Sequence, residues 1–277
     1  MIRVDSHHHV WRVARGDYDW LTPDMPIYRD FTLADLRPHL ADITATVLVQ
    51  AAPTDGETAF MLTVARDSQD LVRGVVGWMD LAAADAVARV AALASEPLLK
   101  GLRPMLQDIA DTDWILHPAV QPALNAMAQH GLRFDALIEP RHLPAMLSLV
   151  LRHPDLPIVI DHAAKPAIAQ GAFEPWATDI ARLARETNAT CKLSGLVTEA
   201  ASNWHRNDLR RTVDHLIDCF GPARLMWGSD WPVVELAGGY ARWRAATDYL
   251  LAGLDATSRD AVLGGTATMF YGLDQPA

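Results

Sequence analysis

Several common signatures are missing from this sequence, and each absence removes a class of protein. The 277 residues contain only two cysteines, Cys191 and Cys219, and neither belongs to a C-x-x-C pair. This excludes a disulfide framework, so we expect a reducing, cytoplasmic setting. The chain starts MIRVD, without the apolar stretch of a signal peptide. The longest apolar run, at 143–151, contains Pro144 and is too short to cross a membrane, so we expect no membrane partner.

An excess of positive charge is also missing. The sequence has 24 Lys and Arg against 34 Asp and Glu, which gives a formal net charge of −10. An acidic protein repels phosphate backbones, so we expect no nucleic-acid partner. The motifs G-x-S-x-G, G-x-G-x-x-G, H-E-x-x-H and the P-loop are all absent. Serine-hydrolase, dinucleotide and nucleotide chemistry are therefore disfavoured.

Apolar and amphipathic segments are present, and they alternate along the whole chain. Half of the residues are apolar, which is enough for a large core. Eight segments have the pattern of buried strands, at 2–5, 45–50, 72–79, 99–103, 133–137, 158–161, 189–193 and 225–227. Amphipathic helical patterns follow them, at 32–40, 58–67, 84–94, 118–129, 141–153, 175–185, 208–220, 241–251 and 258–271. This alternation predicts a (β/α)8 TIM barrel with a single domain over residues 1–277. A doubly wound open sheet is the structural alternative, but the expected Gly-rich turn after the first strand is absent.

Polar residues follow several of the predicted strands, where the active sites of such barrels lie. His7 and His9 alternate in an extended segment and should share a face, and His162 follows the sixth strand. Three imidazoles can hold a metal ion or donate hydrogen bonds to one oxygen. Asp230 follows the eighth strand, and its carboxylate can act as a general base, ligate a metal or cap a helix.

Other candidates are more equivocal. Arg103 ends the fourth strand and suits either a substrate contact or a structural ion pair. Lys192 and Ser194 alternate on one face of the seventh strand, so one of them is expected to line the cavity. The aromatic residues Trp204 and Trp231, with His205, lie in connections after strand ends and are candidates for substrate binding.

Six segments together resemble the amidohydrolase superfamily, in particular its amidohydrolase 2 branch, which includes sugar-acid lactonases. They are DSHHHVW (5–11), GWMDL (77–81), GLRPMLQD (101–108), DHAAKP (161–166), KLSGLVTEA (192–200) and MWGSDWP (226–232). The resemblance implies roles for His7, His9, His162 and Asp230. The family's strand-five histidine is absent, because that strand reads RFDAL, and Lys100 lies away from the strand end. A dinuclear metal centre therefore lacks ligands.

The resemblance implies hydrolysis of a sugar-acid lactone, such as L-fucono- or L-rhamnonolactone, to the aldonic acid. Asp230 would activate water while His7, His9 and His162 polarise the carbonyl, and Arg103, Trp204, His205 and Trp231 would bind the sugar. No cofactor is required in this scheme, as in the related 2-pyrone-4,6-dicarboxylate lactonases. The alternative is that His7, His9 and Asp230 bind one divalent metal ion, for which zinc is the favoured candidate.

Two further readings stay open at this point. One is a metal-dependent decarboxylase, or a lactonase, of an aromatic-degradation intermediate, although the decarboxylases normally add the missing strand-five histidine. The other is a non-catalytic barrel that binds a ligand. Several convergent polar groups argue against it, because they would cost stability without a purpose. A small-molecule substrate is expected in either enzyme reading, and a homo-oligomer is compatible with the sequence.

Overall fold

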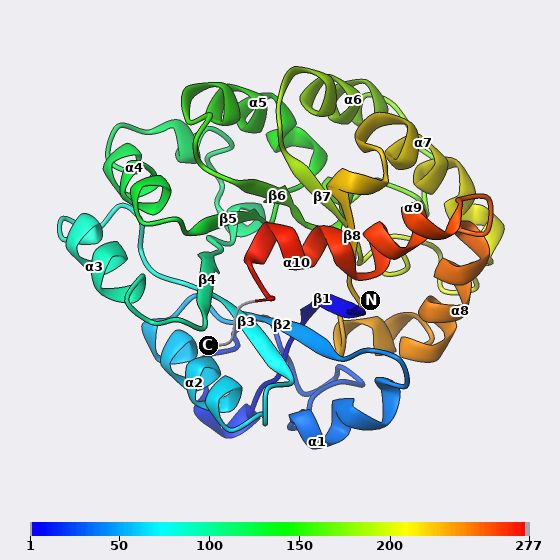
Figure 1. The fold of residues 1–277 in the computed structure, drawn as a ribbon, viewed down its shortest axis with the longest axis horizontal. Helices are drawn as coiled ribbons and strands as arrows, with labels where there is room; N and C mark the ends of the chain where they lie inside the picture. The colour runs from blue at the N-terminus through cyan, green and yellow to red at the C-terminus, as the bar shows by residue number, and fades with distance from the viewer. Residues whose placement is uncertain (1, 275–277) are drawn as a thin grey trace.

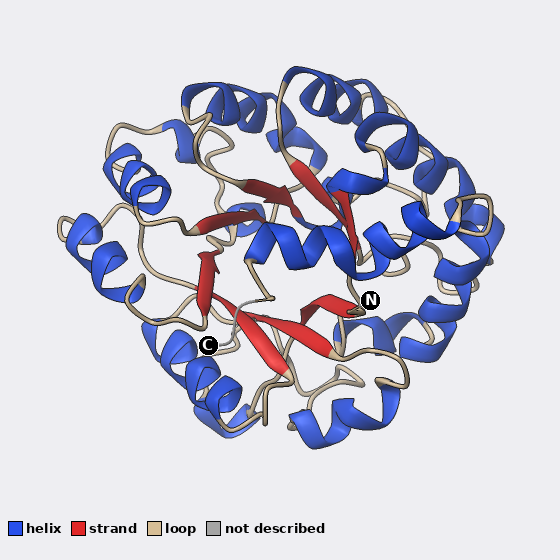
Figure 2. Ribbon diagram, viewed as in Figure 1, coloured by secondary structure: helices blue, strands red, loops and turns tan. Residues whose placement is uncertain are grey.

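The computed structural model describes residues 2–274, and it contains the eight predicted strands. They are β1 (Val4–His8), β2 (Ala45–Val49), β3 (Val72–Gly77), β4 (Leu99–Leu102), β5 (Arg133–Ala136), β6 (Ile158–Ile160), β7 (Thr190–Leu193) and β8 (Leu225–Trp227). Each strand pairs in parallel with the next one in the chain, from β1 to β8. The strands surround the centre of the molecule, and the helices form an outer layer (Figures 1 and 2).

The ring of strands closes between β8 and β1. The backbone amide of Asp230 donates to the carbonyl of His7 at 2.8 Å, and the amide of His9 donates to the carbonyl of Trp231 at 2.7 Å. A closed ring of parallel strands with helical crossovers is the (β/α)8 barrel. The prediction of this fold is confirmed, and the doubly wound open sheet is excluded.

The outer helices follow the predicted segments with small shifts at their ends. They are α1 (Leu33–Leu36), α2 (Asp55–Arg66), α3 (Ala86–Leu93), α4 (Gln121–Gln129), α5 (Leu143–Arg152), α6 (Trp176–Glu186), α7 (Arg210–Phe220) and α8 (Tyr240–Leu250). The predicted N-cap Thr32 is present, with Asp35 completing a capping box. The last predicted helix is interrupted: α9 (Ala256–Asp260) and α10 (Thr266–Tyr271) flank a wider turn. Gly264 lies in this turn, where any side chain would collide with the carbonyl of Ile2.

The α10 helix lies across one end of the barrel (Figure 1). Its Ala267 and Tyr271, together with Leu273, pack against an apolar layer of strand residues inside the ring, which comprises Val4, Ala45, Val47, Val49, Val76, Val159 and Met226. This packing closes the N-terminal end of the barrel. The Tyr271 hydroxyl reaches further into the interior and donates to Asp135 of β5 at 2.6 Å.

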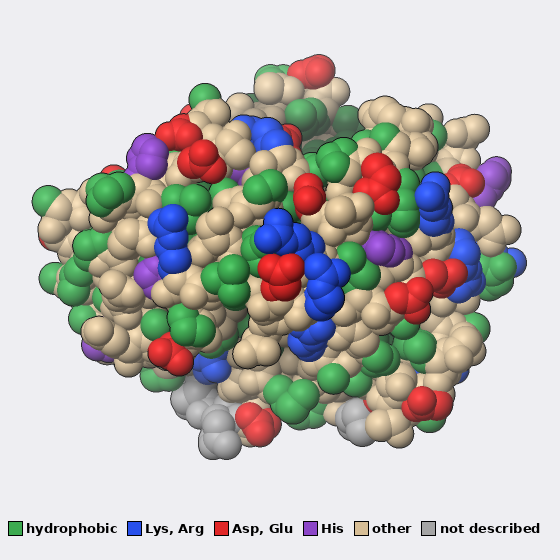
Figure 3. Space-filling model, turned by 90° about the horizontal axis from the view of Figure 1, so that it is seen from above, with side chains coloured by type: hydrophobic (Ala, Val, Ile, Leu, Met, Phe, Trp, Pro, Cys, Tyr) green, Lys and Arg blue, Asp and Glu red, His purple; other side chains and the backbone are tan. Residues whose placement is uncertain are grey.

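Charges of both signs are mixed on the outer surface. On the face over α5, α6 and α7, basic and acidic side chains lie beside one another (Figure 3). On α6, Arg182 and Arg185 both pair with Glu186, at 3.1 and 3.2 Å. Among the residues described, no helix has the length and apolar character needed to span a membrane.

We expect the bond between Tyr271 and Asp135 to contribute measurably to stability. Tyr271→Phe removes a buried donor from a carboxylate, so the free energy of unfolding should fall by about 1.5–3 kcal/mol. Urea denaturation measures the change. Tyr249→Phe is the matched control, because the Tyr249 hydroxyl donates to Asn207 at the exposed surface, and a loss under about 0.5 kcal/mol is expected there. Equal effects of the two variants would contradict the role assigned to Tyr271.

Candidate active site

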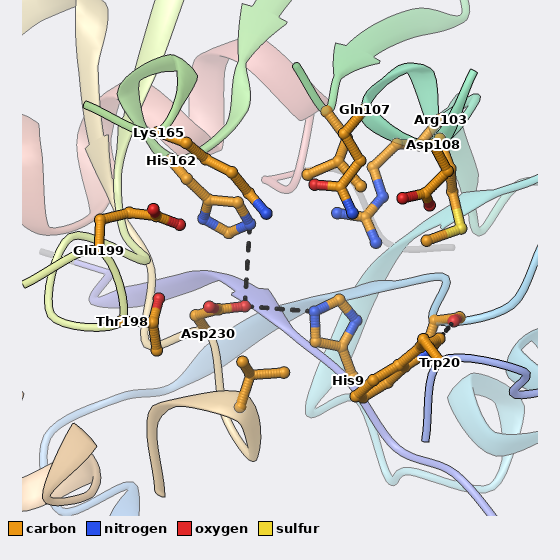
Figure 4. Close-up of a pocket in the computed structure, with 14 residues that line it drawn as sticks. His9, Trp20, Arg103, Gln107, Asp108, His162, Lys165, Thr198, Glu199 and Asp230 are labelled. Carbon is orange, nitrogen blue, oxygen red and sulfur yellow. Dashed lines mark hydrogen bonds and ion pairs between the residues drawn. The ribbon is translucent and has the colours of Figure 1, made fainter. Parts of the chain in front are cut away.

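A cavity of about 200 Å³ lies at the C-terminal ends of the strands. Such a position is where (β/α)8 enzymes place their active sites. The cavity has an apolar part and a polar part (Figure 4). Its lining residues are His9, Trp20, Ala51, Arg103, Met105, Gln107, Asp108, Leu137, His162, Lys165, Thr198, Glu199, Asp230 and Val233.

One carboxylate oxygen of Asp230 lies at the centre of the polar part. The Nε2 atoms of His9, His7 and His162 lie 3.3, 3.8 and 3.9 Å from it. Figure 4 shows His9 and His162 pointing at this oxygen from two sides. His8 points elsewhere and bonds to Thr46 at 2.9 Å, so the predicted alternation along β1 is present. His162 and Asp230, which are 68 positions apart in the sequence, thus join the His7 and His9 pair.

An unusual backbone presents His162 to the cavity. Four consecutive residues, His162 to Lys165, have left-handed φ angles between 51 and 59°. Such angles cost energy in residues other than glycine, and they gather at functional sites. Gly195, in the loop after β7, leaves the room needed, because a Cβ there would collide with the His162 ring. Asp230 is also left-handed, with φ of 58°.

Hydrogen bonds at the second ring nitrogens limit what each histidine can do. The Nδ1 of His9 lies 2.8 Å from the carbonyl of Val49 and must donate to it. A neutral His9 therefore presents a lone pair at Nε2, which can accept a hydrogen bond across the 3.3 Å contact only when Asp230 carries a proton. The Nδ1 of His162 lies 2.9 Å from the hydroxyl of Ser194. That hydroxyl can donate, which leaves the proton of His162 on Nε2.

His7 is fully buried beneath the cavity, between charged groups. The ammonium of Lys192 lies 3.1 Å from its Nδ1, and a carboxylate oxygen of Asp161 lies 3.5 Å from the same atom. Burial and the neighbouring Lys192 hold the pKa of His7 well below its ordinary value of 6.5. His7 is therefore a neutral imidazole at physiological pH.

The protonation states of the other site residues follow from burial and neighbouring charges. Burial lowers the pKa of His162 to about 4, although Asp230 opposes the shift. Burial acts to raise the pKa of Asp230, but His162 and His9 outweigh it and the pKa lies below its ordinary value. At neutral pH the site therefore combines the Asp230 carboxylate, as a general base requires, with neutral imidazoles at His7 and His162.

Arg103 makes the structural ion pair that the sequence left open, and it also lies where a substrate contact is feasible. Its guanidinium lies 3.2 Å from a carboxylate oxygen of Asp161 and bonds to the backbone carbonyl of Gln50. The side chain also lines the cavity, near Gln107 and Asp108 (Figure 4). These bonds hold the guanidinium rigidly, which favours the binding of an oxygen-rich ligand.

The distances around Asp230 suit a divalent ion, but the hydrogen bonding does not. Ligand atoms of His7, His9 and Asp230 lie within 4.8 Å of one another. The Val49 carbonyl bonds to Nδ1 of His9 in the usual manner for a metal ligand, since the partner of a ligating histidine is normally an acceptor. At His7 that partner is the ammonium of Lys192, which can only donate. The three residues therefore do not form a complete set of lone-pair donors.

Three predicted substrate-binding residues lie away from this cavity. Trp204 and His205 line a separate surface pocket together with Arg242, and the Trp204 indole donates to the carbonyl of Ala237 at 2.8 Å. Trp231 is buried against Phe31 at a ring distance of 5.2 Å. These positions do not support direct contact with a ligand bound at Asp230. The loop after β7 and the segment after β8 direct these side chains away from the cavity, and the sequence alone does not show this.

The cavity also contains residues for which the sequence analysis assigned no role. Trp20 comes from the long loop 10–30, and its indole donates to the carbonyl of Ala51 at 2.7 Å. Gln107, Lys165 and Glu199 lie in three of the quoted motifs, GLRPMLQD, DHAAKP and KLSGLVTEA. Gln107, Lys165 and Glu199 follow strands β4, β6 and β7 closely, and this position in the sequence could have indicated that they line the cavity.

A carboxylate among imidazoles at the mouth of a (β/α)8 barrel defines a barrel hydrolase. Residues 4–273 match the family model described as amidohydrolase, and the chain belongs to this family. The resemblance found in the sequence is thereby confirmed.

Two relatives cover nearly the whole chain. The chain is 47% identical to the L-fucono-1,5-lactonase of Burkholderia ambifaria, over 99% of this chain and 97% of the relative. It is 38% identical to the L-fucono-1,5-lactonase of Burkholderia multivorans, over 100% of this chain and 98% of the relative. A crystal structure of a Burkholderia multivorans amidohydrolase with bound zinc superposes with a TM-score of 0.92 at 36% identity, over 98% of this chain and 99% of that chain.

Proposed function

We propose that this protein hydrolyses L-fucono-1,5-lactone, or a closely similar sugar-acid lactone, to the free aldonic acid. The observation that carries the proposal is the Asp230 carboxylate, which lines a polar cavity and lies within 3.9 Å of the Nε2 atoms of three imidazoles. The identity of 47% over almost the full length of a lactonase supports the choice of substrate.

The reaction requires a general base and donors for the developing oxyanion. Asp230 takes a proton from a water molecule as that water attacks the ring carbonyl carbon. The Nε2–H groups of His7 and His162 and the guanidinium of Arg103 face the carbonyl oxygen and stabilise its negative charge. The C–O bond of the ring then breaks, and the proton on Asp230 passes to the leaving ring oxygen. One water is consumed and one carboxylic acid is formed.

His9 has a different role in this scheme from the one expected. Its Nδ1 proton is committed to the carbonyl of Val49, so a neutral His9 cannot also donate to the substrate. Its Nε2 instead accepts a hydrogen bond from Asp230 once that carboxylate has taken up the proton of the water. Around them, Trp20, Met105 and Val233 form an apolar wall, while Gln107, Lys165 and Glu199 face the hydroxyl groups of the sugar.

The decarboxylase reading has less support from the structure. The position where that branch carries a strand-five histidine falls in β5, where Asp135 is buried and bonded to Lys192 and Tyr271. No imidazole from β5 can therefore enter the site.

A panel of 1,4- and 1,5-lactones of sugar acids tests the function directly. We expect acid release, followed with a pH-indicator dye, to be fastest with L-fucono-1,5-lactone and unchanged after chelator treatment and dialysis. L-Rhamnono- and L-galactonolactone are the matched substrates. If none of the lactones is hydrolysed, with or without added zinc, the proposed function is wrong, and carbon dioxide release from aromatic acids becomes the next assay.

The base assignment predicts a severe loss of activity in Asp230→Asn. Removal of the general base should lower kcat by about 10²- to 10⁴-fold, while the circular dichroism spectrum and melting temperature stay near those of the parent. Asp108→Asn, which changes another carboxylate of the same cavity, is the control and should mainly alter KM. Retention of more than about a tenth of kcat in Asp230→Asn would contradict the assignment.

The pH dependence of the activity follows from the ionisation of Asp230 and His162. Activity needs Asp230 ionised and His162 neutral, and the pKa of His162 is about 4. The value of kcat/KM should therefore stay level from neutral pH down to about pH 5 and fall as the pH passes through about 4. Initial rates in a pH-stat, corrected for spontaneous hydrolysis, measure this profile. An inflection near 6.5, the ordinary pKa of histidine, would instead place a normally titrating imidazole in the rate.

A further inference from the structure

The interior of the barrel holds a lysine that the reaction scheme does not use. Lys192 of β7 is fully buried, and its ammonium lies 2.6 Å from Asp135 and 3.0 Å from Asp161. An ammonium loses several kcal/mol of hydration when it is buried, so it needs close acceptors on every side. Two of these acceptors are the carboxylates, and the third close group is the Nδ1 of His7, at 3.1 Å.

The contact with His7 has only one chemically sensible form. An ammonium carries protons and no lone pair, so it can only donate a hydrogen bond. The Nδ1 of His7 must then be the acceptor, and the single proton of the neutral ring lies on Nε2. Nε2 lies 3.8 Å from the carboxylate of Asp230, which lines the cavity.

Two other groups near His7 compete with this arrangement, and both are weaker. Asp161 would accept a proton from Nδ1, but it lies 3.5 Å away, further than Lys192. The guanidinium of Arg103 lies 3.4 Å from Nε2 and could donate to a lone pair there, but it is closer to its acceptor Asp161, at 3.2 Å. A neutral ring has one lone pair for two cations, and the shorter contact is the one with Lys192.

We propose that Lys192 is a positioning residue that fixes the proton of His7 on Nε2, so that His7 is a hydrogen-bond donor to the substrate and not a metal ligand. The inference rests on the proposed lactone hydrolysis only for its effect on the rate. Without Lys192, Nδ1–H can donate to Asp161, and the Nε2 lone pair becomes free for a metal ion. Lys192 therefore decides whether His7 donates a hydrogen bond or ligates a metal ion.

Nuclear magnetic resonance of the unmodified protein labelled with ¹⁵N-histidine tests the tautomer directly. His7 is assigned by comparison with His7→Gln, and the proton is expected on Nε2. A proton found on Nδ1 would overturn the proposal, and this result does not depend on any substrate. If no lactone is hydrolysed, the proposed function fails, while the spectrum still decides the role of Lys192.

Lys192→Met keeps the length of the side chain and removes the donor. We expect kcat to fall by about 10²- to 10³-fold, the effect of losing one oxyanion donor, with KM changed less than about threefold. The proton of His7 should move to Nδ1, and the affinity for added zinc chloride, measured against a competing chelator, should rise by about tenfold or more. An unchanged tautomer together with an unchanged kcat would refute the proposal.

Two further variants separate this effect from simple loss of structure. Lys192→Met combined with Asp135→Asn keeps the buried net charge constant, so it should fold if the single variant does not, and the same shift of the His7 proton is expected. Lys100→Met is the matched control, because Lys100 of β4 is a half-buried lysine outside the cavity. It should leave kcat, the His7 tautomer and zinc affinity as they are in the parent.

Discussion

The pairing of Lys192 with Asp135 and Asp161 is the constraint on which the interior of this barrel depends. The three residues come from β7, β5 and the end of β6. A carboxylate oxygen of Asp135 lies 2.6 Å from the Lys192 ammonium, and one of Asp161 lies 3.0 Å from it. Arg103 adds a second positive charge, so two cations balance two carboxylates among buried side chains. Such a cluster is costly to bury and costly to break, because the loss of one member leaves another charge unpaired.

This charged layer separates two regions with different tasks. Below it, Tyr271 and the apolar residues around α10 close the barrel, and the Tyr271 hydroxyl donates to Asp135. Above it lies the cavity with Asp230, His9 and His162. His7 belongs to both regions, since one ring nitrogen meets Lys192 and the other faces Asp230. The buried charge cluster thereby holds the His7 ring, which is part of the site, in a fixed position.

The sequence predicts the barrel and the central residues of the site for physical reasons that are local. The spacing of apolar residues along the sequence predicts the strands and helices. Residues that follow parallel strands must meet at one end of the sheet. His7, His9, His162 and Asp230 could be found in this way. Trp204 and His205 could not be placed, because a long loop can turn toward or away from the cavity. The contact between Lys192 and Asp135, residues 57 positions apart, depends on the stagger of three strands, which no local pattern records.

The substrate and the buried lysine are consistent with each other. A lactone is an activated ester, so its hydrolysis needs less electrostatic assistance than that of an amide, for which a metal ion is a common solution. In this chain a fixed positive charge lies directly behind His7, at 3.1 Å from Nδ1. A cation donating to one ring nitrogen withdraws electrons from the ring and makes the Nε2–H a stronger donor. In the proposed mechanism, Lys192 and the His7 imidazole thus supply part of the carbonyl polarisation that a metal ion would provide. In the same proposal, Lys192 leaves no lone pair on the Nε2 of His7 for such an ion.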